Sequence, residues 1–207
     1  MNQEIVKRIL SSIIIIAIAL FFIVKGSFFF IFFLFLCFFI TSFEWYKMTK
    51  NKNYFLLGLA FLILSFLSAF LLRNIFLKDF ILVILICIST DIGGFVFGKI
   101  FKGPKLTKIS PNKTYSGMIG SFFLSIIFAL IYTNYYSLIY WSDNLLLIVV
   151  ILISFISQIG DLTFSYFKRK SKIKNTGKII PGHGGLLDRI DGMLFAIPFS
   201  YILFKFL

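Results

Sequence analysis

The sequence predicts an all-α protein, a polytopic transmembrane helical bundle of about seven spans with a cytoplasmic N-terminus. Of its 207 residues, 59% are hydrophobic and 20% aromatic, whereas only 14% are charged. Thirty phenylalanines and long isoleucine runs carry more apolar surface than one compact core could bury. Part of this surface must therefore face lipid, which excludes an ordinary soluble domain.

The predicted helices are the apolar runs long enough, or nearly so, to cross about 30 Å of hydrocarbon. In chain order they cover residues 9–24, 27–43, 54–72, 79–97, 117–137, 144–164 and 193–207. The first and last runs are short. We expect each to tilt little, to extend into flanking residues or to be partly re-entrant. Lys7 and Arg8 resemble the start of a signal peptide, but Lys25 follows without a small-residue cleavage pattern, which favours a retained first helix.

The basic residues predict the orientation of these helices. Alternating the spans from a cytoplasmic N-terminus places 17 of the 21 Lys and Arg residues on one side of the membrane. Because cytoplasmic loops accumulate positive charge, this side is the predicted cytoplasmic one. The net charge of +13 is then concentrated where it can attract anionic lipid headgroups, and no nucleic-acid-binding fold is recognisable in the loops. We expect a protein of the cell (inner) membrane whose site faces the cytoplasm.

The chain divides by motif content into two regions. Residues 1–80 are predicted to form transmembrane helices without a motif, and residues 81–207 to form the catalytic region with long cytoplasmic loops at 98–116 and 165–192. Four aspartates of this second region lie at similar depth on the predicted cytoplasmic side: Asp91, Asp161, Asp188 and Asp191. A carboxylate near the hydrocarbon costs about 2 to 3 kcal/mol, so each needs an ion-pair partner, a bound ion or a functional role.

Helical periodicity adds two features. A polar stripe on the run 144–164 recurs at spacings of three, four and seven residues, and comprises Ser154, Ser157, Gln158, Asp161 and Ser165. Such a face is expected to point inward. Series of small residues predict close helix contacts, either within the chain or in a homodimer, and comprise Thr90, Gly94 and Gly98 on one run and Gly117, Ser121 and Ser125 on the next.

The loop before the last run carries the richest motif. It reads Ser165-x-x-Lys168-Arg169, then Lys174-Asn175, then Pro181-x-His183-Gly184-Gly185-x-x-Asp188-Arg189-x-Asp191. This pattern resembles the signature of the phosphatidate cytidylyltransferase (CDP-diacylglycerol synthase) family. The stretches Gly160-Asp161-Leu162 and Ser110-Pro111-Asn112-Lys113-Thr114 are similar to two further elements of that family, so the resemblance covers roughly residues 88–192. The family usually has acidic residues where this chain has Ser116, Phe164 and Asn175, and its members are usually longer.

The resemblance implies transfer of a cytidylyl group from CTP to phosphatidate with release of pyrophosphate. It implies that Asp161 and Asp188 hold Mg²⁺, with Asp91 and Asp191 as further ligands or as ligands of a second cation. The cationic residues Lys113, Lys168, Arg169 and Arg189 would neutralise the phosphates. Substrate contacts are expected from Ser110, Thr114, Gly184 and Gly185, whereas His183 is either a substrate contact or a polar loop residue.

Two other functions fit parts of the pattern. A CTP-dependent enzyme of the same architecture could act on another lipid, such as an ether-lipid phosphate, or could phosphorylate an isoprenoid alcohol. An ion-coupled transporter would instead carry charges near the bilayer midplane on several helices. The aspartates gather near the predicted cytoplasmic end beside basic loops, which favours a headgroup site.

Overall fold

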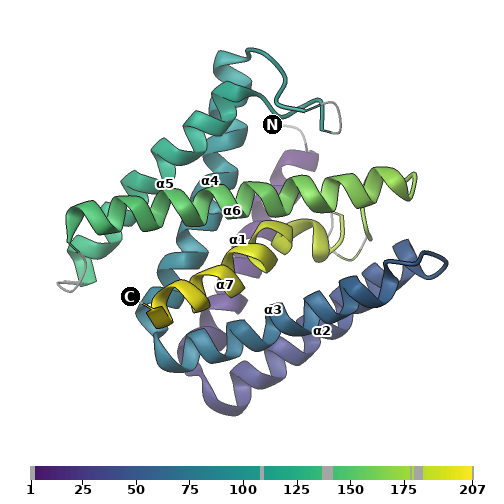
Figure 1. Cartoon of the computed structure of the whole chain (residues 1–207), viewed down its shortest axis with the longest axis horizontal. Helices are drawn as coiled ribbons and strands as arrows, with labels where there is room; N and C mark the ends of the chain where they lie inside the picture. Colours follow the sequence, from purple (N-terminus) through teal and green to yellow (C-terminus); the bar gives the residue numbers. More distant parts are fainter. Residues whose placement is uncertain (1–2, 108–109, 137–141, 178, 180–183, 207) are drawn as a thin grey trace.

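The fold is a bundle of helices (Figure 1). The computed structural model describes residues 3–107, 110–136, 142–177, 179 and 184–206. Over these residues it contains seven helices, α1 (Gln3–Lys25), α2 (Ser27–Thr49), α3 (Phe55–Ile75), α4 (Leu77–Phe101), α5 (Tyr115–Tyr136), α6 (Asp143–Lys170) and α7 (Leu187–Phe206). Each predicted apolar run coincides with one helix. The all-α prediction is therefore confirmed.

Five helices, α2 to α6, are long and apolar enough to cross a membrane. The described side chains of α1 add a shorter apolar stretch, Ile14–Lys25. Helix α7 differs because Asp188, Arg189 and Asp191 fall within its first five residues, and its apolar part begins after them. The chain is thus a multi-pass membrane protein.

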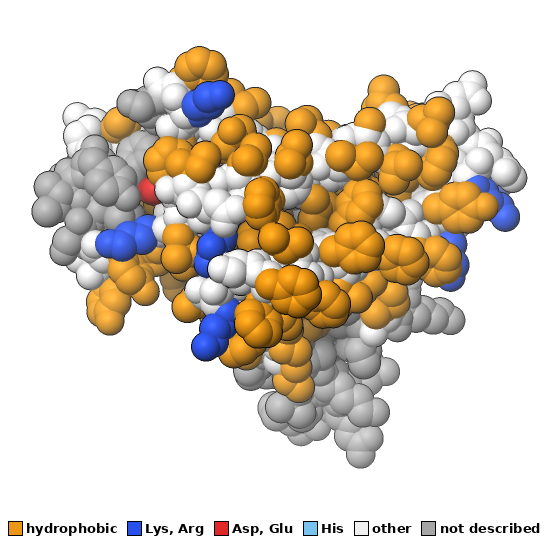
Figure 2. All heavy atoms as spheres, turned by 90° about the horizontal axis from the view of Figure 1, so that it is seen from below, with side chains coloured by type: hydrophobic (Ala, Val, Ile, Leu, Met, Phe, Trp, Pro, Cys, Tyr) orange, Lys and Arg blue, Asp and Glu red, His pale blue; other side chains and the backbone are white. Residues whose placement is uncertain are grey.

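The outer surface of the bundle is apolar. Large side chains such as Phe28, Phe35 and Leu57 are exposed on α2 and α3. Figure 2 shows one face on which hydrophobic side chains predominate, with a few Lys and Arg side chains among them toward the left and right. A surface of this kind is suited to lipid, because in water it would favour aggregation.

The connections between helices alternate between two ends of the bundle. At one end, Ser171 after α6 donates a hydrogen bond to the Met48 carbonyl of α2 at 3.0 Å, and Lys113 before α5 pairs with Asp161 of α6. At the other end, Arg73 of α3 donates to the Ile23 carbonyl of α1 at 2.8 and 3.0 Å. The connections α4–α5 and α6–α7 therefore lie at the same end, as a shared site requires.

Helices α4 and α5 approach each other through small residues. A Cβ atom added to Gly93 would lie 2.5 Å from the Gly120 carbonyl oxygen, and one added to Gly117 would lie 2.7 Å from that of Gly94. Ser121 donates to the Thr90 carbonyl at 2.7 Å. The close contact predicted from the small-residue series is confirmed within the chain.

The polar stripe of α6 faces α4 and the start of α7, where Ser157 lies against Gly192. Ser154 and Ser157 are buried, and the Thr90 hydroxyl of α4 donates to the Ser154 hydroxyl at 2.8 Å. The predicted inward orientation is confirmed for this part of the stripe. It brings the following turns of α6, which carry Asp161 and Lys168, to the site end of the bundle.

Candidate active site

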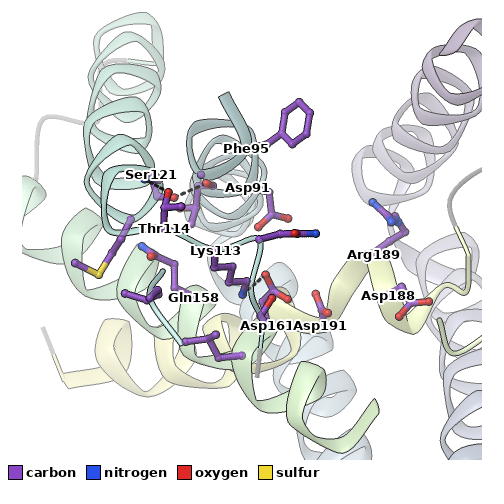
Figure 3. A pocket seen from close by; sticks show the side chains of 18 of the residues that line it. Asp91, Phe95, Lys113, Thr114, Ser121, Gln158, Asp161, Asp188, Arg189 and Asp191 are labelled. Atoms are coloured by element: carbon purple, nitrogen blue, oxygen red, sulfur yellow. Dashed lines mark hydrogen bonds and ion pairs between the residues drawn. The ribbon is translucent and has the colours of Figure 1, made fainter. Parts of the chain in front are cut away.

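A cavity of about 490 Å³ opens where α4, α5, α6 and α7 meet the connection between α4 and α5. All four predicted aspartates line it, Asp91 from α4, Asp161 from α6, and Asp188 and Asp191 from α7. Figure 3 shows Asp161 beside Lys113, Asp91 above them, and Asp191 and then Asp188 farther to the right. The cavity also has a set of cationic and polar side chains that sequence reasoning placed in the site: Ser110, Lys113, Thr114, Lys168 and Arg189.

We call one half of this cavity the α4–α5 side, formed by α4, α5, their connection and the facing Asp161. Its central interaction is the ion pair between Lys113 Nζ and Asp161 Oδ2, at 2.5 Å. Both side chains keep partial contact with solvent, with 25% and 31% of their surface exposed. The backbone around Lys113 is fixed, because its N–H donates to the Ser110 carbonyl and its carbonyl accepts from Leu106. The backbone of Lys113 is thus held in place, while its side chain can still exchange Asp161 for another partner.

Thr114 has a structural task on the same side. Its hydroxyl oxygen accepts a hydrogen bond from the N–H of Gly117 at 3.1 Å, in the first turn of α5. A threonine immediately before a helix commonly satisfies such an N–H group. The residue therefore sets the direction in which α5 leaves the cavity, in addition to lining it.

The other half, which we call the α7 side, consists of the start of α7, the preceding loop and Lys168. Asp188 Oδ1 accepts from Lys168 Nζ at 2.9 Å, and Asp188 Oδ2 accepts from the N–H groups of Thr176 and Gly185 at 2.8 and 3.0 Å. Only 6% of the Asp188 side chain is exposed. Both oxygens of this carboxylate already have partners in the protein.

Lys168 joins the two aspartates of α7. Its ammonium group lies 3.5 Å from Asp191 Oδ2 in addition to its contact with Asp188. Asp191 is buried and also accepts from the N–H of Gly192 at 3.0 Å. A buried cation between two carboxylates is stable only while all its partners stay in place, because an unpaired buried charge is costly.

Sequence reasoning missed Glu44, a residue of α2. Its carboxylate is 2% exposed and accepts hydrogen bonds from the Thr176 hydroxyl and from the N–H groups of Leu186 and Leu187. These donors belong to the loop that carries the signature. One feature of the sequence could have indicated Glu44: it follows the apolar run 27–43 directly. A carboxylate at this position needs a partner for the same reason as the four aspartates.

Three predicted site residues lie elsewhere. Arg169 is exposed, donates to the Ile173 carbonyl at 3.4 Å, and is not among the residues that line the cavity. Gly184 and Gly185 lie behind Asp188: Gly184 has a φ of 94°, a conformation that glycine tolerates, and the Gly185 N–H points at Asp188. The anion that this N–H contacts is thus the protein's own carboxylate. His183 lies outside the described residues.

The carboxylates of the cavity fit a magnesium ion only together with a substrate. Among the described residues, no group of three His, Cys, Asp or Glu side chains is close enough to hold a metal ion. Magnesium in phosphate chemistry commonly takes one or two carboxylates, with phosphate oxygens and water as its other ligands. Asp91 and Asp161 provide oxygen donors of this kind beside the cavity.

Comparison with known proteins identifies the family. A family model described as the cytidylyltransferase family matches residues 54–207. The chain belongs to this family. Phosphatidate cytidylyltransferase of Rickettsia prowazekii is 37% identical over 164 residues, which cover 75% of this chain and 72% of the relative. Those of Staphylococcus saprophyticus and Staphylococcus aureus are 35% and 37% identical over 165 residues, and the chain spans 62% of the length of each.

Within this cytidylyltransferase chain, the three departures from the family pattern have identifiable environments. Phe164 is buried, and its ring packs edge-on against Trp45 and Phe195 with centroids 6.0 and 6.1 Å apart. Ser116 donates to the Lys102 carbonyl and lies 3.0 Å from the Thr114 hydroxyl. Asn175 lines the cavity. Only the last of these three positions is therefore part of the site itself.

Proposed function

We propose that this chain is a CTP:phosphatidate cytidylyltransferase that forms CDP-diacylglycerol and pyrophosphate for phospholipid synthesis. The single observation that supports it most is that four aspartates and three cationic side chains, from segments distant in sequence, line one cavity at one end of a lipid-facing bundle. The names of the relatives agree with this activity.

The chemistry of the reaction matches the charges. A phosphate oxygen of phosphatidate forms a new bond to the α-phosphorus of CTP, and the bond between the α- and β-phosphates breaks to release pyrophosphate. The attacking oxygen is already anionic, so no general base is required. The site must instead reduce repulsion between two polyanions and stabilise the charge that develops on the leaving group.

The protein supplies cations for this purpose at different depths of the cavity. Lys113 can exchange its half-exposed partner Asp161 for a substrate phosphate, and Arg189 can bind phosphate with two parallel hydrogen bonds. Lys168 remains with Asp188 and Asp191 and contributes positive charge from a fixed position. Asp161 and Asp91 would hold Mg²⁺ beside them, and Asp188 and Asp191 would support it. The bound ion would offset the charge of the triphosphate.

The apolar surroundings suit a lipid substrate. Phe95 of α4 lines the cavity and is 69% exposed, and its neighbour Ile92 is also exposed. Acyl chains could stay in the bilayer against this face of α4 while the headgroup reaches the carboxylates. The basic connections at the same end favour the cytoplasmic face of the inner membrane, where CTP is available.

The test is product formation by the purified chain in lipid-containing micelles with labelled CTP, phosphatidate and Mg²⁺. We expect a lipid product that carries cytidine, together with pyrophosphate, and loss of both when Mg²⁺ is chelated. Asp161→Asn and Asp91→Asn should each reduce turnover at least about 100-fold. A product that carries phosphate without cytidine would indicate a lipid kinase. Wild-type turnover in both variants would overturn the assignment of the cation site.

A further inference from the structure

Glu44 connects α2 to the signature loop through an unusual concentration of hydrogen bonds. Oε2 accepts from the Thr176 hydroxyl at 2.9 Å and from the Leu187 N–H at 2.8 Å, and Oε1 accepts from the Leu186 N–H at 3.0 Å. The side chain is almost completely buried. Such a group is retained only where its hydrogen bonds offset the cost of removing a charge from water.

The position of Glu44 explains why a carboxylate is needed. Helix α7 begins at Leu187, so the N–H groups of Leu186 and Leu187 have no acceptor inside the helix. Glu44 accepts both, one on each oxygen, and its negative charge lies near the positive end of the helix dipole. A glutamine has one acceptor oxygen and could satisfy only one of the two N–H groups.

The same loop residues also hold Asp188. Thr176 donates to Asp188 through its backbone N–H and to Glu44 through its hydroxyl. Gly185 donates to Asp188, and the next residue, Leu186, donates to Glu44. Two short segments are therefore fixed between the two carboxylates. If Glu44 releases them, the donors that orient Asp188 and its partner Lys168 are released as well.

The glycines of the loop fit this arrangement. A Cβ atom added to Gly185 would lie 2.5 Å from Glu44 Oε2, and one added to Gly177 would lie 2.6 Å from Glu44 Oε1. Real Cβ atoms are not found at such distances, so the absence of side chains at both positions makes room for the carboxylate. Glu44 also lies outside residues 54–207, the part of the chain that the family model matches.

We propose that Glu44 is a positioning residue for the active site: it holds the loop and the start of α7 in the geometry that directs Asp188 and Lys168 into the cavity. This role rests on the proposed cytidylyltransferase function. Glu44 does not line the cavity, so it acts through the residues it holds.

The experiment compares Glu44→Gln with Thr41→Val in the full-length chain. Thr41 is equally buried on the same helix, but within the described part of the chain its hydroxyl bonds to carbonyls of α2 itself. Hydrogen exchange measured by mass spectrometry should show the amides of residues 184–190 exchanging at least about tenfold faster in Glu44→Gln. In the same variant, kcat should fall about 10- to 100-fold while the KM for CTP changes little, because misplacement near 1 Å has effects of that size. Thr41→Val should match the wild type in each measurement.

Each other result has a defined meaning. Unchanged exchange in Glu44→Gln, or equal acceleration in Thr41→Val, would overturn the anchoring of the loop. Faster exchange with an unchanged kcat would overturn the positioning role. A wild-type chain that forms no cytidine-linked lipid would overturn the proposed function, whereas the exchange comparison would still test the anchor. If Glu44→Gln does not fold, Thr176→Val is used instead, because it removes one of the three hydrogen bonds to Glu44. This variant must also show faster amide exchange and a lower kcat, each by a smaller factor.

Discussion

The two sides of the cavity are held together by different interactions. On the α4–α5 side, backbones meet directly through Gly93, Gly94, Gly117 and Gly120, and the ionised groups contribute little to that packing. On the α7 side, the loop and the helix start are held by ionised groups themselves. The difference indicates which charges are available to a ligand: those of the α4–α5 side can change partners without loosening the fold.

The two sides also differ in how much of their lysine–aspartate pairs is exposed to solvent. Lys113 and Asp161 keep 25% and 31% of their side chains exposed, whereas Lys168 and Asp188 keep 11% and 6%. A half-exposed ion pair contributes about 0 to 1 kcal/mol to folding, because water competes for both partners. Breaking a buried pair is costly because the remaining charge stays behind without compensation. The first pair is suited to exchange with substrate and the second to maintaining geometry.

The largest expected effect distinguishes these two pairs directly. Lys168→Met should lower turnover about 100- to 1000-fold and also destabilise the protein by about 1 to 3 kcal/mol, since Asp188 and Asp191 lose their shared cation. Lys113→Met should lower turnover about 10- to 100-fold with a change in stability below about 1 kcal/mol. Thermal unfolding in detergent and the product assay measure the two quantities. Equal destabilisation by both variants would contradict the comparison.

An intermediate effect, on stability alone, tests the packing of the α4–α5 side. Gly93→Ala should destabilise the protein by about 1 to 3 kcal/mol, because the new Cβ meets the Gly120 carbonyl oxygen at 2.5 Å and backbone cannot move aside easily. Gly98→Ala is the matched control on the same helix. Its Cβ meets the Thr114 hydroxyl at 3.1 Å and the Gly117 Cα at 3.6 Å, an ordinary contact distance, and alanine favours the helix by about 0.5 to 1 kcal/mol, so the two changes nearly cancel. Equal unfolding temperatures for the two variants would show that the helices are not held at Gly93.

The sequence predicted the helices and the proximity of the four aspartates, because apolar runs and family motifs are short continuous stretches of the chain. Helical spacing also distinguishes Lys168 from Arg169. Asp161, Ser165 and Lys168 are spaced by four and three residues and so share one face of α6, whereas Arg169 is turned about 100° away. Helical periodicity alone therefore separates the two basic residues.

The hydrogen bonds of Glu44 had no comparable local signal. Its partners lie 132 to 143 residues away, and only the packing of α2 beside α7 brings them together. The division of the chain at residue 80, the bound Mg²⁺ and a homodimer stay predictions. Each concerns a boundary or a partner that the contacts within one chain do not determine.

The smallest expected effect separates the two arginines of the signature. Arg189 lines the cavity, whereas Arg169 is exposed and bonds to the Ile173 carbonyl. Arg189→Gln should therefore lower turnover about tenfold or more and raise the KM for CTP or phosphatidate, because a bidentate phosphate contact is lost. Arg169→Gln should lower turnover only about two- to threefold, through the weaker positive field at the site end, and added salt should reduce even that difference. Initial rates at two ionic strengths measure both variants. If Arg169→Gln had the larger effect, the end of α6 would have to turn toward the cavity when substrate binds, and the α7 side would then be less rigid than its buried ion pairs indicate.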